Sequence, residues 1–152
     1  MQRNSFYKTN LKYLLIFLLL VIYESLSSIY LYLSPLYGVA FYYIIRHMYE
    51  KNYLFRVVLA FIYIIIFEID KGFIPLSFLL FFSIYYFFII DKIERFFNDK
   101  NYRIFFHILN AYIGYYLINL ILSYIFNYTL PSIDCKYLFY IFTDFIVASV
   151  VV

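Results

Sequence analysis

The longest apolar stretch of the chain is residues 104–126, which read IFFHILNAYIGYYLINLILSYIF. It contains no Asp, Glu, Lys or Arg. A helix that crosses the hydrocarbon core of a bilayer needs about 20 predominantly apolar residues. The stretch therefore predicts a membrane-spanning helix, and it lacks the period-2 alternation that a transmembrane β-strand would require.

Basic residues mark where the other apolar stretches begin and end. Lys and Arg accumulate in the cytoplasmic loops of membrane proteins, and this bias sets their orientation. Ten of the twelve Lys and Arg residues form three groups: Arg3, Lys8 and Lys12; Arg46, Lys51 and Arg56; and Lys92, Arg95, Lys100 and Arg103. The pattern predicts that all three groups lie on the cytoplasmic side of an inner membrane.

The number of spans between Lys12 and Arg46 decides whether the first basic group lies on the same side of the membrane as the other two. The segment is too long for one crossing and tight for two. Ser34, Pro35 and Gly38 mark a place where the chain can turn. We therefore expect two short spans here, and the second either crosses fully or is half-buried.

The whole chain is then expected to be an all-α, polytopic membrane protein in one domain, a compact bundle of about six helices with both termini in the cytoplasm. The expected spans are residues 12–30, 33–46, 57–69, 73–90, 104–126 and 137–152, with Pro75 in the first turn of the fourth and a polar loop at residues 91–103.

Composition agrees with a bilayer as the solvent. The chain is 66% hydrophobic and 14% charged, with 20 Phe and 21 Tyr residues, whereas soluble domains carry about 25% charged residues. The net charge of +3 is spread over membrane flanks, so it does not predict nucleic-acid binding. The single Cys135 excludes an internal disulfide and a multi-cysteine metal site, and no cofactor is expected.

Four acidic residues lie in or beside the apolar stretches, where an ionisable group is costly. Glu24, Glu68 and Asp70 lie near external helix ends, and we expect them to be solvated there, with a contact to a partner or another span as the alternative. Asp144 lies within the last stretch. It predicts either packing inside the bundle or an interface to another membrane protein, with an ion or proton site as a third possibility; His107 and Asn110 are its candidate neighbours.

Small and polar residues follow one face of the stretch at 104–126. His107, Asn110 and Gly114 have i, i+3, i+7 spacing, which predicts a packing face for another helix. The chain contains no Gly-rich phosphate loop, no Ser or Cys nucleophile next to a base, and no HExxH motif. We therefore expect a protein that is not an enzyme.

Residues 67–76, which read FEIDKGFIPL, carry a family resemblance. Asp70, Gly72, Pro75 and Leu76 fit the acid, small residue and Pro-Leu that end the third helix and open the fourth in the rod shape-determining membrane protein MreD family, although Ser77 replaces the usual Gly. Asp144 resembles an acid near the start of the family's last helix. The order of apolar segments is also similar to that family.

The resemblance implies a non-enzymatic scaffold of the bacterial cell-wall elongation machinery in the inner membrane. It implies binding to the bitopic partner MreC and proximity to a RodA-type polymerase and its transpeptidase. Two alternatives remain: a small-molecule-binding component like the substrate-binding subunits of energy-coupling-factor transporters, and an uncharacterised membrane assembly subunit. A polar pocket among the external helix ends would favour the small-molecule-binding component over the scaffold.

Overall fold

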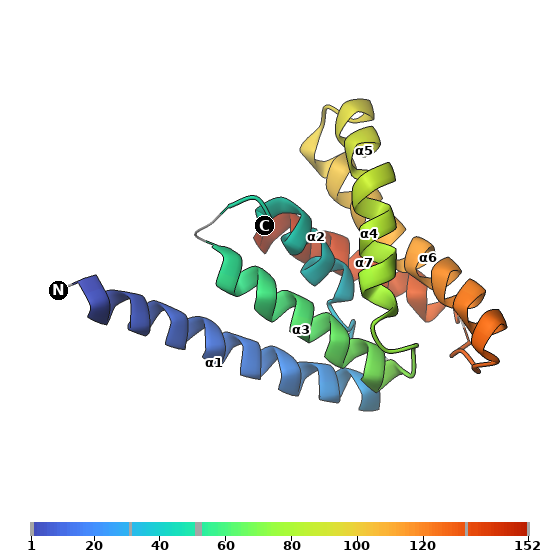
Figure 1. Cartoon of the computed structure of the whole chain (residues 1–152), viewed down its shortest axis with the longest axis horizontal. Helices are drawn as coiled ribbons and strands as arrows, with labels where there is room; N and C mark the ends of the chain where they lie inside the picture. The colour runs from blue at the N-terminus through green and yellow to red at the C-terminus, as the bar shows by residue number, and fades with distance from the viewer. Residues whose placement is uncertain (1, 31, 51–52, 133, 152) are drawn as a thin grey trace.

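The computed structural model describes residues 2–30, 32–50, 53–132 and 134–151, with side chains from residue 11 onward. The described residues form helices and connections only, which confirms the all-α class (Figure 1). The helices are α1 (Gln2–Ile29), α2 (Tyr37–His47), α3 (Leu54–Lys71), α4 (Ser77–Phe88), α5 (Ile90–Phe96), α6 (Lys100–Phe126) and α7 (Lys136–Val151).

Among the described residues, two helices are long and apolar enough to cross a membrane by length and composition. They are Leu11–Ile29 within α1 and Lys100–Phe126, which is α6. The remaining helices are shorter; α2 has 11 residues and α4 has 12. At a rise of about 1.5 Å per residue, each of these two extends less than about 20 Å, which is shorter than the hydrocarbon core.

Helices α1 and α3 run parallel, side by side, along one edge of the molecule (Figure 1). At one end the guanidinium of Arg56 lies 3.9 Å from the ring centre of Tyr13, and at the other the Ser28 hydroxyl donates to the Asp70 carboxylate. The chain therefore turns and returns through α2 between them, as the sequence predicted for the segment between Lys12 and Arg46.

The core is built from aromatic side chains around α2. Helix α2 contacts α3, α6 and α7. Tyr37, at its first turn, is fully buried and stacks on Phe67 with ring centres 4.7 Å apart. The largest fully buried side chains also include Phe41, Phe78, Phe81, Tyr85 and Tyr115. Stacked and edge-to-face pairs of this kind stabilise a core beyond the area they bury.

Three predicted boundaries are wrong, and all three errors come from unrecognised helix starts. Helix α2 begins at Tyr37, four residues after the expected start of the second span. Helix α4 begins at Ser77, so Pro75 lies in the turn before it, where Leu76 has a left-handed backbone with φ 66°. The predicted polar loop at residues 91–103 is largely helical. It contains most of α5 and the start of α6, whose first turn is capped by the Asp99 carboxylate accepting from the Asn101 N–H at 3.1 Å.

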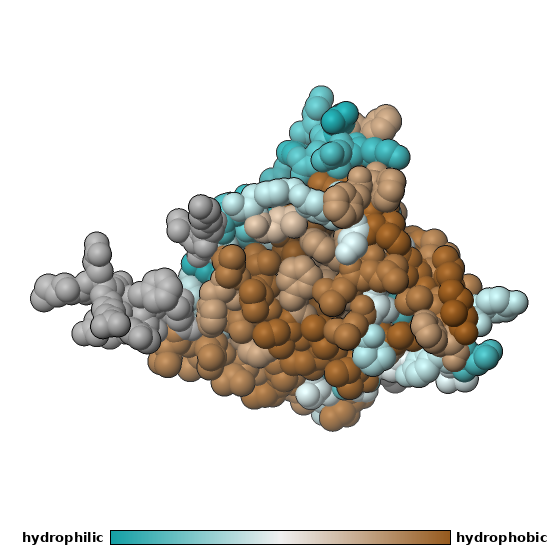
Figure 2. All heavy atoms as spheres, in the orientation of Figure 1, coloured by the Kyte–Doolittle hydropathy of each residue, from teal (hydrophilic) through white to brown (hydrophobic). Residues whose placement is uncertain are grey.

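The surface is divided into zones of different polarity. Figure 2 shows hydrophilic residues gathered at the α5 end, a hydrophobic band across the middle, and further polar residues at the opposite edge. Many exposed side chains are large and apolar, among them Leu19, Ile22, Leu120 and Ile121 on the two long helices. A contiguous apolar surface of this extent is typical of a protein whose solvent is lipid or another apolar surface.

Candidate functional site

Three carboxylates are fully buried inside the helix bundle. Glu24 on α1, Glu68 on α3 and Asp144 on α7 each have 0% exposure. The expectation of solvated helix ends is wrong for Glu24 and Glu68. A buried carboxylate must be hydrogen-bonded or paired, because removing it from water is otherwise very costly. Asp144 and Glu68 accept from the starts of helices, whereas Glu24 pairs with a lysine.

Asp144 binds the first turn of α2. One of its oxygens, Oδ2, accepts from the backbone N–H of Gly38 at 2.7 Å and from the Tyr112 hydroxyl at 2.8 Å. Its other oxygen accepts from the Ser34 hydroxyl. The N-terminus of a helix leaves several N–H groups without partners and carries partial positive charge, so a carboxylate is stabilised there.

Gly38 is required by this arrangement. A Cβ atom at this position would lie 2.9 Å from Asp144 Oδ2 and 2.9 Å from the Ile108 side chain. Real Cβ atoms do not approach other heavy atoms this closely, so a larger residue would displace the carboxylate from the helix end. The predicted neighbours of Asp144, His107 and Asn110, are not its partners; Ser34, Gly38 and Tyr112 take that place.

Glu68 performs the same task for α4. Its Oε1 accepts from the Phe78 N–H at 2.6 Å, the Ser77 hydroxyl at 2.8 Å and the Tyr115 hydroxyl at 2.9 Å. Its Oε2 accepts from the Leu76 N–H at 2.8 Å. Both oxygens are thus occupied by donors of the protein itself, and they close the turn between α3 and α4.

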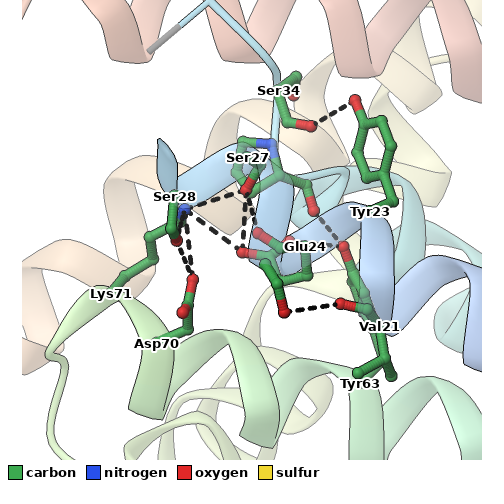
Figure 3. A network of polar contacts seen from close by, with 11 residues as sticks. Val21, Tyr23, Glu24, Ser27, Ser28, Ser34, Tyr63, Asp70 and Lys71 are labelled. Atoms are coloured by element: carbon green, nitrogen blue, oxygen red, sulfur yellow. Dashed lines mark hydrogen bonds and ion pairs between the residues drawn. The ribbon is translucent and has the colours of Figure 1, made fainter. Parts of the chain in front are cut away.

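Glu24 is held by a basic residue and by hydroxyl groups between α1 and α3 (Figure 3). The Tyr63 hydroxyl lies 2.8 Å from Oε2, and the Lys71 ammonium lies 3.5 Å from Oε1. The same ammonium donates to the hydroxyls of Ser27 at 3.0 Å and Ser28 at 2.7 Å. Lys71 is the last residue of α3, and its ammonium group is the counter-ion of the buried Glu24 carboxylate.

Asp70 and Gly72 lie at the end of α3, between the spans expected at residues 57–69 and 73–90. Asp70 is exposed, accepts from the Ser28 hydroxyl and lies 3.5 Å from the Lys71 ammonium. Gly72 ends the helix in the left-handed region with φ 72°, a conformation that glycine adopts without the steric cost of a Cβ. Pro75 follows in the connection to α4.

The predicted face of α6 packs inward, but its members have separate partners. His107 is buried and its Nδ1 lies 2.7 Å from the Tyr85 hydroxyl. Asn110 donates to the Phe106 carbonyl of its own helix at 2.8 Å. Gly114 lies against Phe81: a Cβ atom added at Gly114 would be 3.0 Å from the nearest atom of the Phe81 ring. Among the described residues, no group of three or more His, Cys, Asp or Glu side chains could hold a metal ion.

Sequence reasoning missed a repeated local pattern that marks the capped helices. Pro35-Leu36 precedes α2 and Pro75-Leu76 precedes α4. Leu36 and Leu76 both have left-handed backbones, with φ 52° and 66°. Non-glycine residues with positive φ are uncommon, and in both places a buried carboxylate accepts from the N–H groups that the turn exposes. The repetition of Pro-Leu was the signal available in the sequence.

An apolar groove lies between α1, α2, α3 and α7. Its volume is about 500 Å³, and the small residues Ala40 and Ala60 stand in its wall. Arg56, which contacts the rings of Tyr13 and Tyr53, lies among its lining residues. The other lining residues are Tyr13, Ile16, Phe17, Leu20, Leu36, Val39, Tyr43, Leu59, Tyr63, Val147 and Val151.

Comparison with known protein families, with curated proteins and with solved structures finds no match to this chain.

Proposed function

We propose that the chain is a multi-pass protein of the bacterial inner membrane that acts as a non-enzymatic scaffold, similar to the MreD family, and binds the single transmembrane helix of a bitopic, MreC-like partner. A RodA-type polymerase and its transpeptidase are the further neighbours that the resemblance implies. The observation that carries the proposal is the apolar groove between α1, α2, α3 and α7.

The membrane arrangement has α1, α2, α3, the α4–α5 pair, α6 and α7 passing alternately outward and inward, with both termini in the cytoplasm. Two contacts support it. Arg56 of the second basic group meets Tyr13 beside the first, and Arg46 shares a cavity with Arg95, Lys100 and Arg103 of the third. The described residues of the basic groups that make these contacts thus lie at one end of the bundle, which agrees with the positive-inside bias.

Helices α2 and α4 are too short to span alone, and the two capped turns explain how they are tolerated. Non-helical backbone at membrane depth is stable only where protein groups satisfy its N–H and C=O groups. Asp144 does this for α2 from the middle of α7, and Glu68 does it for α4. Asn119 accepts from the Ile74 N–H at 3.3 Å and adds a third such contact.

The groove suits a transmembrane helix rather than a polar ligand. Helices associate in membranes through close packing at small residues, and Ala40 and Ala60 allow such an approach. The alternative of a small-molecule-binding component calls for free polar groups among the external helix ends. There the oxygens of Glu24, Glu68 and Asp144 already accept hydrogen bonds from the chain, so we rank the scaffold first.

Site-specific cross-linking tests the proposed partner contact. In a Cys135→Ser background, cysteines are introduced at Ala60 in the groove or at Ile113, which is 51% exposed on α6 and outside the groove. With single cysteines along the partner helix, we expect disulfide cross-links to Ala60→Cys and none to Ile113→Cys. Equal cross-linking at the two positions, or none at Ala60→Cys with normal expression, would contradict the proposal and favour an unidentified assembly role.

A further inference from the structure

A second cavity, on the side opposite the capped turns, is lined by basic side chains. Its volume is about 490 Å³, and it lies between α2, α5 and the start of α6. Arg46, Arg95, Lys100 and Arg103 contribute positive charge to it, whereas Asp91 and Glu94 contribute negative charge. Tyr42, Ile45, Tyr49, Ile90 and His107 complete the wall.

The positive charge of this cavity is only partly compensated, because four basic side chains share its wall with two carboxylates. The one ion pair that the described lining residues form there joins Arg103 Nη1 to Glu94 Oε2 at 3.5 Å. No hydrogen bond or ion pair joins the side chains of Arg46, Arg95 or Lys100 to another described residue. The Nε of Arg103 is buried and has no hydrogen-bond partner. An unsatisfied buried N–H of a charged group is costly, so the site is incomplete without an acceptor.

We infer that this cavity binds a phosphate group, and that an anionic phospholipid headgroup of the cytoplasmic leaflet is its source. Guanidinium groups bind phosphate oxygens through paired N–H donors, and lysine adds a point charge. The positive end of the α6 dipole lies at the same place, since α6 begins at Lys100. Basic pockets between transmembrane helices on the cytoplasmic side are a recurring form of headgroup site.

Apolar residues at the same end of the bundle favour a lipid over a soluble phosphate ester. Phe87 and Phe88 at the end of α4 and Phe96 at the end of α5 are 74%, 65% and 82% exposed. Aromatic side chains at this depth offer a surface for the acyl chains that continue from a headgroup. This lipid source rests on the membrane arrangement proposed above, whereas the phosphate site itself does not.

Binding of defined probes to the purified full chain in a maltoside detergent tests the inference. The probes are dioctanoyl phosphatidylglycerol, dioctanoyl phosphatidylcholine and glycerol 3-phosphate. The test variant combines Arg46→Gln, Arg95→Gln and Lys100→Gln, all at exposed positions. The control is Lys92→Gln, which removes a charge from α5 but does not line the cavity.

We expect phosphatidylglycerol to bind and phosphatidylcholine to bind much more weakly. The triple variant should lose at least about tenfold in affinity for phosphatidylglycerol, equivalent to about 1.4 kcal/mol, because it removes three cationic donors for phosphate oxygens. The Lys92→Gln control should stay within about twofold, as is usual for an exposed charge. The native chain could instead bind glycerol 3-phosphate as tightly as phosphatidylglycerol, and the triple variant could lose this binding. That result would support the phosphate site and assign its ligand to a soluble ester.

Any of three results would overturn the inference. The native chain could bind no anionic probe, or it could bind phosphatidylcholine as tightly as phosphatidylglycerol. The triple variant could also bind phosphatidylglycerol with the affinity of the native chain. If the triple variant unfolds, the single exchanges Lys100→Gln and Lys92→Gln form a matched pair of exposed lysines, and equal phosphatidylglycerol affinities in that pair would equally exclude the site.

Discussion

Three fully buried or nearly buried tyrosines on α2 and α6 differ in what their hydroxyl groups do. Those of Tyr112 and Tyr115 donate to Asp144 and Glu68, whereas the hydroxyl of Tyr37 is buried without a partner among the described residues. Tyr112 and Tyr115 are spaced i, i+3, so one face of α6 serves both carboxylates. This contrast separates the role of the ring from the role of the hydroxyl.

Exchange of each tyrosine for phenylalanine should therefore have opposite consequences. Tyr112→Phe and Tyr115→Phe should each lower the free energy of unfolding in detergent by about 1–2 kcal/mol, since each removes a buried hydrogen bond to a carboxylate. Tyr37→Phe should be neutral or stabilising, because it removes a hydroxyl that has no partner. Thermal unfolding followed by circular dichroism checks the series, and a loss for Tyr37→Phe as large as for Tyr112→Phe would contradict it.

Asp144 provides a second test at the residue scale. Asp144→Leu should lower membrane abundance and thermal stability, because the Gly38 N–H and the Tyr112 hydroxyl would lose their acceptor at about 1–3 kcal/mol each. Asp144→Asn should be much milder, since an amide keeps an oxygen for these donors and offers its NH₂ to Ser34. If the Leu variant is as abundant and stable as the native chain, Asp144 does not cap α2.

At the scale of single elements, the apolar stretches predicted the helices, and capping interactions decided their ends. The span predicted at residues 57–69 became α3, and the one at 104–126 became α6 with one further turn started by Asp99. The inward direction of Glu24 and Glu68 could not be predicted, because Tyr63 and Tyr115, which donate to them, lie 39 and 47 residues away in the chain. Only the fold brings these hydroxyls to the carboxylates.

The end of α3 gives a prediction for an element boundary. Gly72→Val should destabilise the protein by about 1–2 kcal/mol, the usual cost of a left-handed backbone for a residue with a Cβ. Apart from its two chain neighbours, no described residue has an atom within 4 Å of the position that a Cβ would take, so the cost comes from the backbone. Gly72→Asn should recover most of the loss, because Asn tolerates this conformation. Equal unfolding temperatures for the Val and Asn variants would show that the backbone does not govern this turn.

At the scale of the whole molecule, the polar groups divide between two ends with different roles. Asp144, Glu68 and Glu24 accept hydrogen bonds from the chain and hold two short helices in place. The basic cavity at the other end has donors to spare. In the proposed membrane arrangement, the three buried carboxylates lie toward the outside and the basic cavity lies toward the cytoplasm.

The central claim is that the chain crosses the membrane with the ends of α6 on opposite sides, and the native Cys135 offers its most direct test. Cys135 is exposed in the connection between α6 and α7, whereas Asp99 lies at the opposite end of α6. Spheroplasts are treated with a membrane-impermeant maleimide, with and without permeabilisation. The native chain should be labelled at Cys135 in intact spheroplasts, and a Cys135→Ser, Asp99→Cys variant should be labelled only after permeabilisation. Labelling of both cysteines without permeabilisation, or of Cys135 only after it, would contradict the account.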